Sequence, residues 1–284
     1  MSAETISTTL FEGLDWTQVT CASKINFCDL ELTLPMEVKK QDPAKSILVG
    51  NSLSPEQVVS MMVENTFQSL VQKREAHFIH DLNYSGEILL DPEHYFLEGG
   101  RNIAYKIDAE LEVKFNSTSQ KSEVMQKIED FIGQFGTQNV KESGNAILEE
   151  LYMNAMFDAP REATNRGQKN CSYADGRTSI LRLFKAEGRL LMTCEDPFGS
   201  LDLKKFVKRM DEVYKKGAGE AINLRGEGGA GLGCVIMFEH CEALFLGVIP
   251  GLKTLVTCVI PLGMSNRQRA QVKKSLHLVS KENR

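Results

Sequence analysis

The spacing of apolar residues along the chain predicts a mixture of helices and strands. Apolar side chains that recur every three or four residues predict amphipathic helices, at residues 54–73, 120–135, 138–157 and 203–214. Alternation of apolar and polar residues predicts strands, at residues 7–11, 26–34, 46–49, 111–115, 178–184, 189–194, 243–248 and 252–260. Between residues 74 and 108 we expect a chain of turns, rich in Asn, Asp, Gly and Pro. These elements predict an α/β (α+β) two-layer sandwich, with a mixed sheet that carries helices on one face.

The order of the elements divides the chain into three parts. Residues 109–263 would form the sandwich, and residues 1–108 a smaller mixed α/β domain with a regulatory or sensory role. Residues 264–284 form a basic tail, in which six Lys and Arg residues stand against the single acid Glu282. We expect this tail to be a frayed helix, a weak contact for an acidic partner, or a segment without a role.

Composition limits the classes of function. The chain has 284 residues, of which 42% are hydrophobic and 25% charged, as in ordinary globular proteins. A net charge of −5 argues against non-specific nucleic-acid binding, and no apolar run is long enough to span a membrane. The start of the chain lacks a signal-peptide pattern. Seven scattered cysteines indicate buried thiols rather than disulfides or a metal site. We therefore expect a cytoplasmic protein that binds neither nucleic acid nor membrane.

Glu150 and Asn154 are the first candidates for chemistry. They lie four residues apart on the predicted helix 138–157, so their side chains project one turn apart from one face. An asparagine oxygen can bind Mg²⁺ while the ion keeps some of its waters, and a glutamate can orient a nucleophile or take its proton. The pair also fits the solvated edge of an ordinary core helix.

Two later segments are candidates for a ligand site. Asp196 follows the strand 189–194 and precedes Pro197, which is typical of a turn. A buried carboxylate there could also accept a hydrogen bond from an exocyclic amine. Residues 226–233, Gly-Glu-Gly-Gly-Ala-Gly-Leu-Gly, lead into an apolar run that could form a helix. Glycines let backbone N–H groups approach phosphate oxygens, and a helix start favours negative charge.

Together these segments resemble the motifs of the GHKL (Bergerat-fold) ATPases, which include histidine kinases, type II topoisomerases and mismatch-repair ATPases. That family carries E-x-x-x-N on a helix, D-x-G-x-G at a strand end, and a mobile lid that leads to G-x-G-x-G. The matching residues are Glu150 and Asn154 for the first motif, Asp196 for the second, and Gly229, Gly231 and Gly233 for the third. A strand followed by two helices also resembles the branch of anti-sigma factors and serine protein kinases, and the likeness covers residues 110–263.

The resemblance implies an ATP site and a role for each residue. Asp196 would accept a hydrogen bond from the adenine amino group, Asn154 would bind Mg²⁺, and Glu150 would act as the base or orient the nucleophile. The other nucleotide contacts would come from Gly199, Arg225, Gly229, Gly231, Leu232 and Gly233. The segment 215–229 would form the lid, where Lys215 and Lys216 fit either phosphate binding or simple solvent exposure.

The resemblance also implies a kind of partner. In the anti-sigma branch the phosphate acceptor is a serine hydroxyl of a partner protein, so the chain would be a serine/threonine protein kinase. Its partner would be a regulatory protein, a sigma factor or an anti-anti-sigma-type protein. Homodimers are common in that branch, so the resemblance also implies a possible homodimer.

Phe198 departs from the family pattern. The family has a glycine two residues after the acid, where this chain has Phe198, and Pro197 removes a backbone donor. Phe198 would either crowd the adenine pocket or turn away and leave the bend to Gly199. The alternative function is therefore a non-catalytic regulator of the same fold, with weak or lost nucleotide binding, that acts by docking a partner.

His80 suggests a third function. The sequence Phe-Ile-His-Asp-Leu at residues 78–82 resembles the phosphoacceptor sequence of histidine kinases. A phosphoacceptor histidine lies on a long helix, whereas here the turn sequence Asn-Tyr-Ser-Gly at residues 83–86 follows at once. We therefore favour a structural role for His80.

Overall fold

The computed structural model describes residues 16–31, 33, 35–74, 76–160, 171–173, 175–217, 230–269 and 271–281. Within these ranges nine strands form one sheet, in the order β1-β2-β3-β9-β7-β8-β6-β5-β4. The strands are β1 (Asn26–Asp29), β2 (Ser46–Gly50), β3 (Ser69–Gln72), β4 (Ile107–Phe115), β5 (Ser179–Ala186), β6 (Arg189–Asp196), β7 (Ala243–Ile249), β8 (Lys253–Pro261) and β9 (Ser275–Ser280). β1, β2 and β3 are parallel, as are β7 and β9, and the other pairs are antiparallel. The predicted α/β class with a mixed sheet is confirmed. The predicted strand at residues 7–11 lies outside the described residues.

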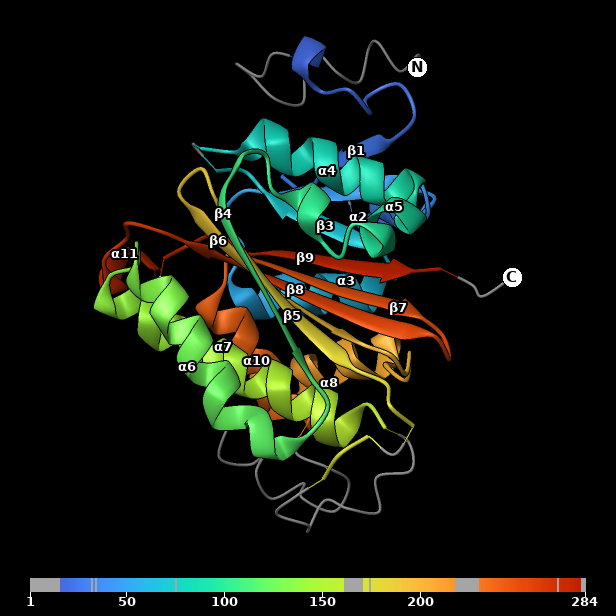
Figure 1. The fold of residues 1–284 in the computed structure, drawn as a ribbon. Coiled ribbons are helices and arrows are strands. Elements are labelled where there is room, and N and C mark those ends of the chain that lie inside the picture. Colours follow the sequence, from blue (N-terminus) through green and yellow to red (C-terminus); the bar gives the residue numbers. More distant parts are fainter. Residues whose placement is uncertain are drawn as a thin grey trace.

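Helices lie on both faces of this sheet (Figure 1). The main core lies between one face and the helices α3 (Pro55–Asn65), α6 (Lys121–Gly133), α7 (Gln138–Met153), α8 (Leu203–Lys216) and α10 (Ala230–His240). A second core lies between the other face and the helices α4 (Phe78–Leu90) and α5 (Pro92–Leu97). The described helices of residues 109–263 therefore pack on one face, as the sandwich predicts, while N-terminal helices cover the other. Short helical turns are η1 (Trp16–Gln18), α2 (Pro35–Val38), η2 (Arg101–Ile103), η3 (Thr118–Gln120), η4 (Asn154–Asp158) and α11 (Asn266–Arg269).

Helix α3 begins where the sequence predicts and ends earlier. Ser54 and Gln57 form a capping box, in which each side chain accepts a hydrogen bond from the other residue's backbone N–H. The helix ends at Asn65 rather than near residue 73, because Thr66 adopts a left-handed conformation with φ at 58°. The chain then turns into β3, whose side chains are all buried.

The predicted chain of turns between residues 74 and 108 is wrong at its centre. Residues 83–86, Asn-Tyr-Ser-Gly, lie inside α4. Gly86 is there for packing and not for a turn, since a Cβ at this position would lie only 2.2 Å from Sγ of Cys21. His80 therefore lies on a helix of 13 residues. The turn that was expected directly after it, and that favoured a structural role, is not there. Its Nε2 donates to the carbonyl oxygen of Ile103 at 2.9 Å, and its ring contacts Tyr84 edge to face.

The C-terminal segment is neither a frayed helix nor an appendage. Residues 275–280 form β9, which lies between β3 and β7 in the middle of the sheet. Leu276 and Val279 are buried, with exposed fractions of 0% and 2%. This strand joins the N-terminal strands to those of residues 109–263, so the three predicted parts contribute to one continuous sheet. The boundaries at residues 108 and 263 stay predictions.

A buried network of charges also crosses the predicted domain boundary. Asp81 of α4 accepts hydrogen bonds from Arg74 at 2.6 Å and from Arg189 of β6 at 2.9 Å. Arg189 in turn contacts Glu242 at 2.6 Å, and all four side chains are at most 9% exposed. Breaking a buried pair leaves an uncompensated charge, so this network opposes separation of α4 from the sheet.

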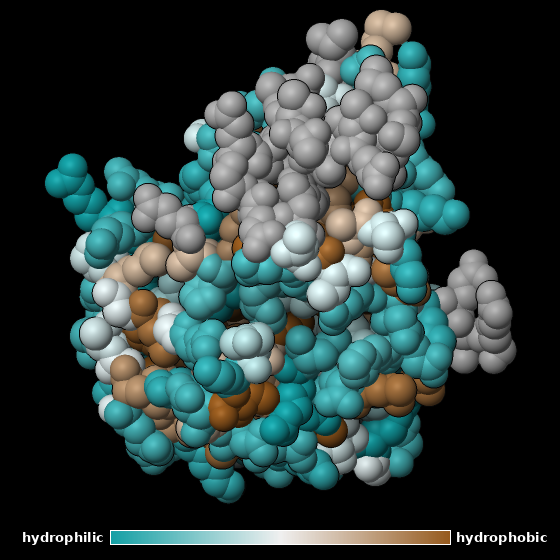
Figure 2. All heavy atoms as spheres, turned by 90° about the horizontal axis from the view of Figure 1, so that it is seen from above, coloured by the Kyte–Doolittle hydropathy of each residue, from teal (hydrophilic) through white to brown (hydrophobic). Residues whose placement is uncertain are grey.

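The surface near α4 is mostly polar. Figure 2 shows hydrophilic side chains over most of the coloured surface, with apolar residues in small separate patches. The large apolar side chains that are most exposed come from different elements: Met36, Leu90, Leu97, Tyr105, Met153 and Leu252. Among the described residues no helix combines the length and the apolar character that a membrane span needs.

Candidate functional site

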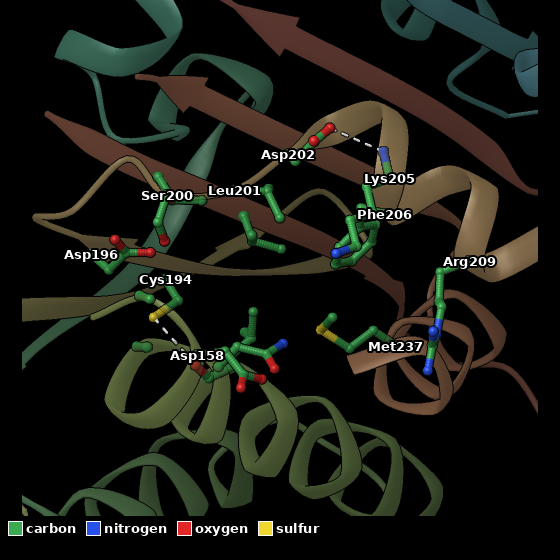
Figure 3. Close-up of a pocket in the computed structure, with 16 residues that line it drawn as sticks. Asp158, Cys194, Asp196, Ser200, Leu201, Asp202, Lys205, Phe206, Arg209 and Met237 are labelled. Carbon is green, nitrogen blue, oxygen red and sulfur yellow. Dashed lines mark hydrogen bonds between the residues drawn. The ribbon is translucent and has the colours of Figure 1, made fainter. Parts of the chain in front are cut away.

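A cavity of about 390 Å³ lies between the sheet and the helices α7, α8 and α10. Its size is within the range of about 300–1,000 Å³ that is common for small-molecule sites. Figure 3 shows side chains of α8 on one side of the cavity, opposite Cys194 and Asp196 of β6 and Asp158 of η4. Its polar lining includes Asn154, Asp158, Asp196, Lys205, Arg209 and Thr254. Its apolar lining includes Leu151, Phe206, Met237 and Val256.

Asn154 and Asp158 reach the cavity from a change in helix geometry. α7 continues past Met153 as the π-helical turn η4, in which the N–H of Ala159 donates to the carbonyl of Asn154 at 2.8 Å. Such single π-turns are frequent at functional sites. Asn154 and Asp158 both line the cavity, so this turn offers an amide and a carboxylate side by side.

Asp196 and Thr254 lie beside each other on the sheet side of the cavity. They are register partners on β6 and β8, and Asp196 is only 7% exposed. Burial raises the pKa of Asp196 to about 6, although the backbone N–H of Phe198, which donates to its carboxylate at 3.0 Å, acts in the opposite direction. A buried carboxylate of this kind favours a ligand that offers it an N–H donor.

Phe198 does not line the cavity. Its ring packs edge to face on Tyr173, with the ring centroids 5.0 Å apart, and the guanidinium carbon of Arg177 lies 4.2 Å from its centroid. The following residue makes this arrangement possible, because Gly199 has a φ of 56°. A Cβ on Gly199 would lie 2.1 Å from the carbonyl oxygen of Ile249, the last residue of β7. Of the two outcomes considered for Phe198, the structure therefore has the one in which the ring turns away and Gly199 makes the bend.

Glu150 lies outside the cavity lining, against the first turn of α10. A Cβ added to Gly233 would lie 1.9 Å from Oε2 of Glu150, so the carboxylate occupies the space that a side chain would fill. Partial burial raises the pKa of Glu150, and the nearby charges of Asp158 and Glu149 act in the same direction. Glu150 is thus held next to the cavity without facing into it.

The glycine motif has a different local structure from the one predicted. α10 begins at Ala230, so Gly231, Leu232 and Gly233 lie within a helix and not in a loop. Gly229 and Arg225 lie outside the described residues, as does the lid segment from residue 218 onward. Lys215, a candidate for phosphate binding, forms an ion pair with Asp211 of α8 at 2.7 Å.

The sequence reasoning missed several residues of this cavity. For Lys205 and Arg209 the sequence analysis predicts only an amphipathic helix, although their spacing of four residues places them on one face. Asp158 continues the four-residue spacing of Glu150 and Asn154, which was a usable signal. Thr254 had no sequence signal, because its place depends on the pairing of β8 with β6.

No family model matches this chain, and no curated protein matches it. Among the described residues no group of three or more His, Cys, Asp and Glu side chains could hold a metal ion by itself.

Proposed function

We propose that the chain is a regulatory protein that binds ATP with Mg²⁺ in this cavity. The observation that carries the proposal is that Asn154 and Asp196, which are distant in the sequence, line one cavity of ligand size. The adenine ring would lie between the sheet and the apolar side chains Phe206 and Met237, with its amino group donating to Asp196. Phe198, the main objection from the sequence, turns away from the cavity and so leaves room for the base.

The magnesium ion fits the donors that are present. Mg²⁺ usually keeps several waters and takes one or two protein oxygens together with phosphate oxygens. Asn154 and Asp158 would supply these protein oxygens from the turn η4, and the ion would neutralise part of the phosphate charge.

Titration calorimetry of ATP and ADP with Mg²⁺ tests this proposal. We expect binding by the wild type, loss of binding in Asp196→Asn, and unchanged binding in Asp108→Asn, a control that removes an exposed acid of β4. Absence of wild-type binding at millimolar nucleotide would refute the proposal. Equal binding of ATP by wild type and Asp196→Asn would show that the adenine amino group does not bind to Asp196.

We further propose phosphoryl transfer from ATP to a serine or threonine of a regulatory partner, such as a sigma factor or an anti-anti-sigma-type protein. Glu150 would then move from its place beside Gly233 to accept the proton of the attacking hydroxyl. Its raised pKa supports this role, because a carboxylate with a higher pKa is the stronger base.

A non-catalytic regulator is the second candidate, and the position of Glu150 favours it. The carboxylate lies against Gly233 and does not line the cavity. The two functions differ in the effect of Glu150→Gln on ADP formation from ATP. A kinase should lose turnover and keep ATP affinity, while Glu149→Gln, which changes an exposed neighbour paired with Lys121, should keep both. A wild type that binds ATP without any turnover would favour the regulator.

A further inference from the structure

Helix α8 presents only basic groups among its charged side chains at the cavity. Of its residues 203–216, those that line the cavity are Lys205, Phe206 and Arg209. Asp211, by contrast, is turned away, since its carboxylate accepts hydrogen bonds from Ser60 of α3 at 2.5 Å and from Lys215 at 2.7 Å. The result is a row of two cations along one wall of the cavity (Figure 3).

These two cations lie one helical turn apart along α8. Lys205 follows Asp202, whose carboxylate caps α8 by accepting from the backbone N–H of Lys205 at 3.0 Å. Arg209 lies one turn further along, and its charge acts on the pKa of the Cys234 thiol in α10, as do Glu150 and Asp158. One helical turn advances about 5.4 Å, which is comparable to the length of a polyphosphate chain.

The acids that line the cavity lie at other positions than this row. Asp202 is engaged as the helix cap, and Asp196 lies at the sheet side with Thr254. Asp158 shares the turn η4 with Asn154, on the opposite side of the cavity from α8 (Figure 3). An extended ligand that is polyanionic at one end could therefore meet basic groups along α8 and a metal-binding pair across from them.

We propose that Lys205 and Arg209 bind the phosphates of a nucleoside di- or triphosphate. This inference rests on the proposed nucleotide site, and it assigns the phosphate contacts to α8. With the base at Asp196, Lys205 binds the phosphate next to the ribose and Arg209 binds the terminal phosphates. Arginine suits the second position, because its planar fork can make two parallel hydrogen bonds to one phosphate.

The test compares four ligands and a matched control. Affinities for ATP, ADP, AMP and adenosine are measured by calorimetry with Mg²⁺ for wild type, Lys205→Gln, Arg209→Gln and Lys208→Gln. Lys208 lies on the same helix, is exposed, and does not line the cavity, so Lys208→Gln makes the same change in charge. Circular dichroism checks that each variant is folded, and Arg209→Lys checks whether a charge alone suffices.

We expect Arg209→Gln to weaken the affinity for ATP and ADP by about 10- to 100-fold and to leave the affinity for adenosine unchanged. Lys205→Gln should weaken AMP as well, and Lys208→Gln should match the wild type for all four ligands. Equal binding of ATP by wild type and both cavity variants would overturn the inference while the adenine site stands. A wild type that binds neither ATP nor adenosine would overturn the proposed function itself.

Discussion

The carboxylate of Glu150 lies where a side chain of residue 233 would be. A Cβ on Gly233 would come within 1.9 Å of Oε2 and 2.6 Å of Cδ of Glu150. Glycine costs stability in a helix, by about 0.5–1 kcal/mol relative to alanine, and here it admits the carboxylate of a neighbouring helix. The sequence predicts that both residues belong to one nucleotide site, and in the structure they are neighbours.

The variant Gly233→Ala tests how firmly this contact holds Glu150. We expect it to destabilise the protein by about 1 kcal/mol, because the flexible end of the Glu150 side chain must move aside, which outweighs the better helix propensity of alanine. The double variant Glu150→Ala/Gly233→Ala should recover most of this loss, since the colliding carboxylate is gone. The free energies of unfolding come from chemical denaturation of the four proteins in the cycle.

Gly133→Ala is the matched control. Gly133 ends α6, and a Cβ there would lie 3.5 Å from Nζ of Lys141, an ordinary contact. We expect this change to be neutral or to stabilise the protein by at most about 1 kcal/mol. If Gly233→Ala behaves like Gly133→Ala, the carboxylate of Glu150 moves aside at no cost and the contact does not position it.

Asp196 should make stability depend on pH between about 4 and 6. Its pKa is raised to about 6 in the folded protein from an ordinary value of 3.8. The folded state therefore binds the proton more tightly than the unfolded state, so this residue lowers stability as the pH rises through that window. Since one pKa unit corresponds to about 1.4 kcal/mol, the full cost above pH 6 is about 3 kcal/mol.

Asp196→Asn removes this cost, because asparagine stays neutral and its oxygen can still accept from Phe198. We expect the variant to be more stable than the wild type at pH 7 and to lose that advantage near pH 4. Urea denaturation of both proteins across this pH range gives the difference in their free energies of unfolding. The contributions of the other titrating groups cancel in this difference. A constant difference at all pH values would show that Asp196 is not responsible.

Phe198→Ala separates stability from ligand binding. The ring packs on Tyr173 and Arg177 and does not line the cavity. We therefore expect a loss of about 1–2 kcal/mol of stability with unchanged ATP affinity. Phe206→Ala, which changes a cavity residue, should instead weaken ATP. Calorimetry of both variants decides, and a tighter complex in Phe198→Ala would mean that the ring obstructs the base after all.

The helices and strands that the sequence predicted correctly are those with a long and regular apolar pattern. α7 begins at Gln138 as predicted, and β5 and β6 form the predicted hairpin. In these segments the regular spacing of the apolar residues that face the core is enough to determine the local structure. The sequence does not predict α4, because Gly86 indicates a turn. In the structure a glycine is needed at this position because the side chain of Cys21 packs against it. No local pattern contains such a contact.

The candidate site was predicted in part, for a similar reason. Asn154 and Asp196 could be identified from motifs, and both line the cavity. Glu150 belongs to the same motif but lies against Gly233, since that position depends on how α7 and α10 pack. Lys205 and Arg209 carried no motif at all. Their relation to the site follows from the packing of α8 against α3 and α10, which a single sequence does not reveal.

The C-terminal strand gives the last prediction, because the sequence predicts no strand in residues 264–284 but a frayed helix, a weak contact for an acidic partner, or a segment without a role. β9 lies between β3 and β7, and Leu276 is fully buried. A chain that ends at residue 263 would expose the edges of both neighbouring strands and lose part of each core. We expect it to lose the cooperative thermal transition in circular dichroism, whereas a chain that ends at residue 281 should keep it.

Leu276→Ala tests the same point in the full chain, in case the truncated chain fails to fold for other reasons. Removing this buried side chain should cost about 2–5 kcal/mol. Leu252→Ala is the control, because Leu252 is 50% exposed in the turn between β7 and β8 and its loss should cost far less. Denaturation of both variants gives the comparison. Equal stabilities of the two variants would contradict the position of β9 inside the sheet. Leu276→Ala should be the more destabilising change only if β9 is buried between its neighbours.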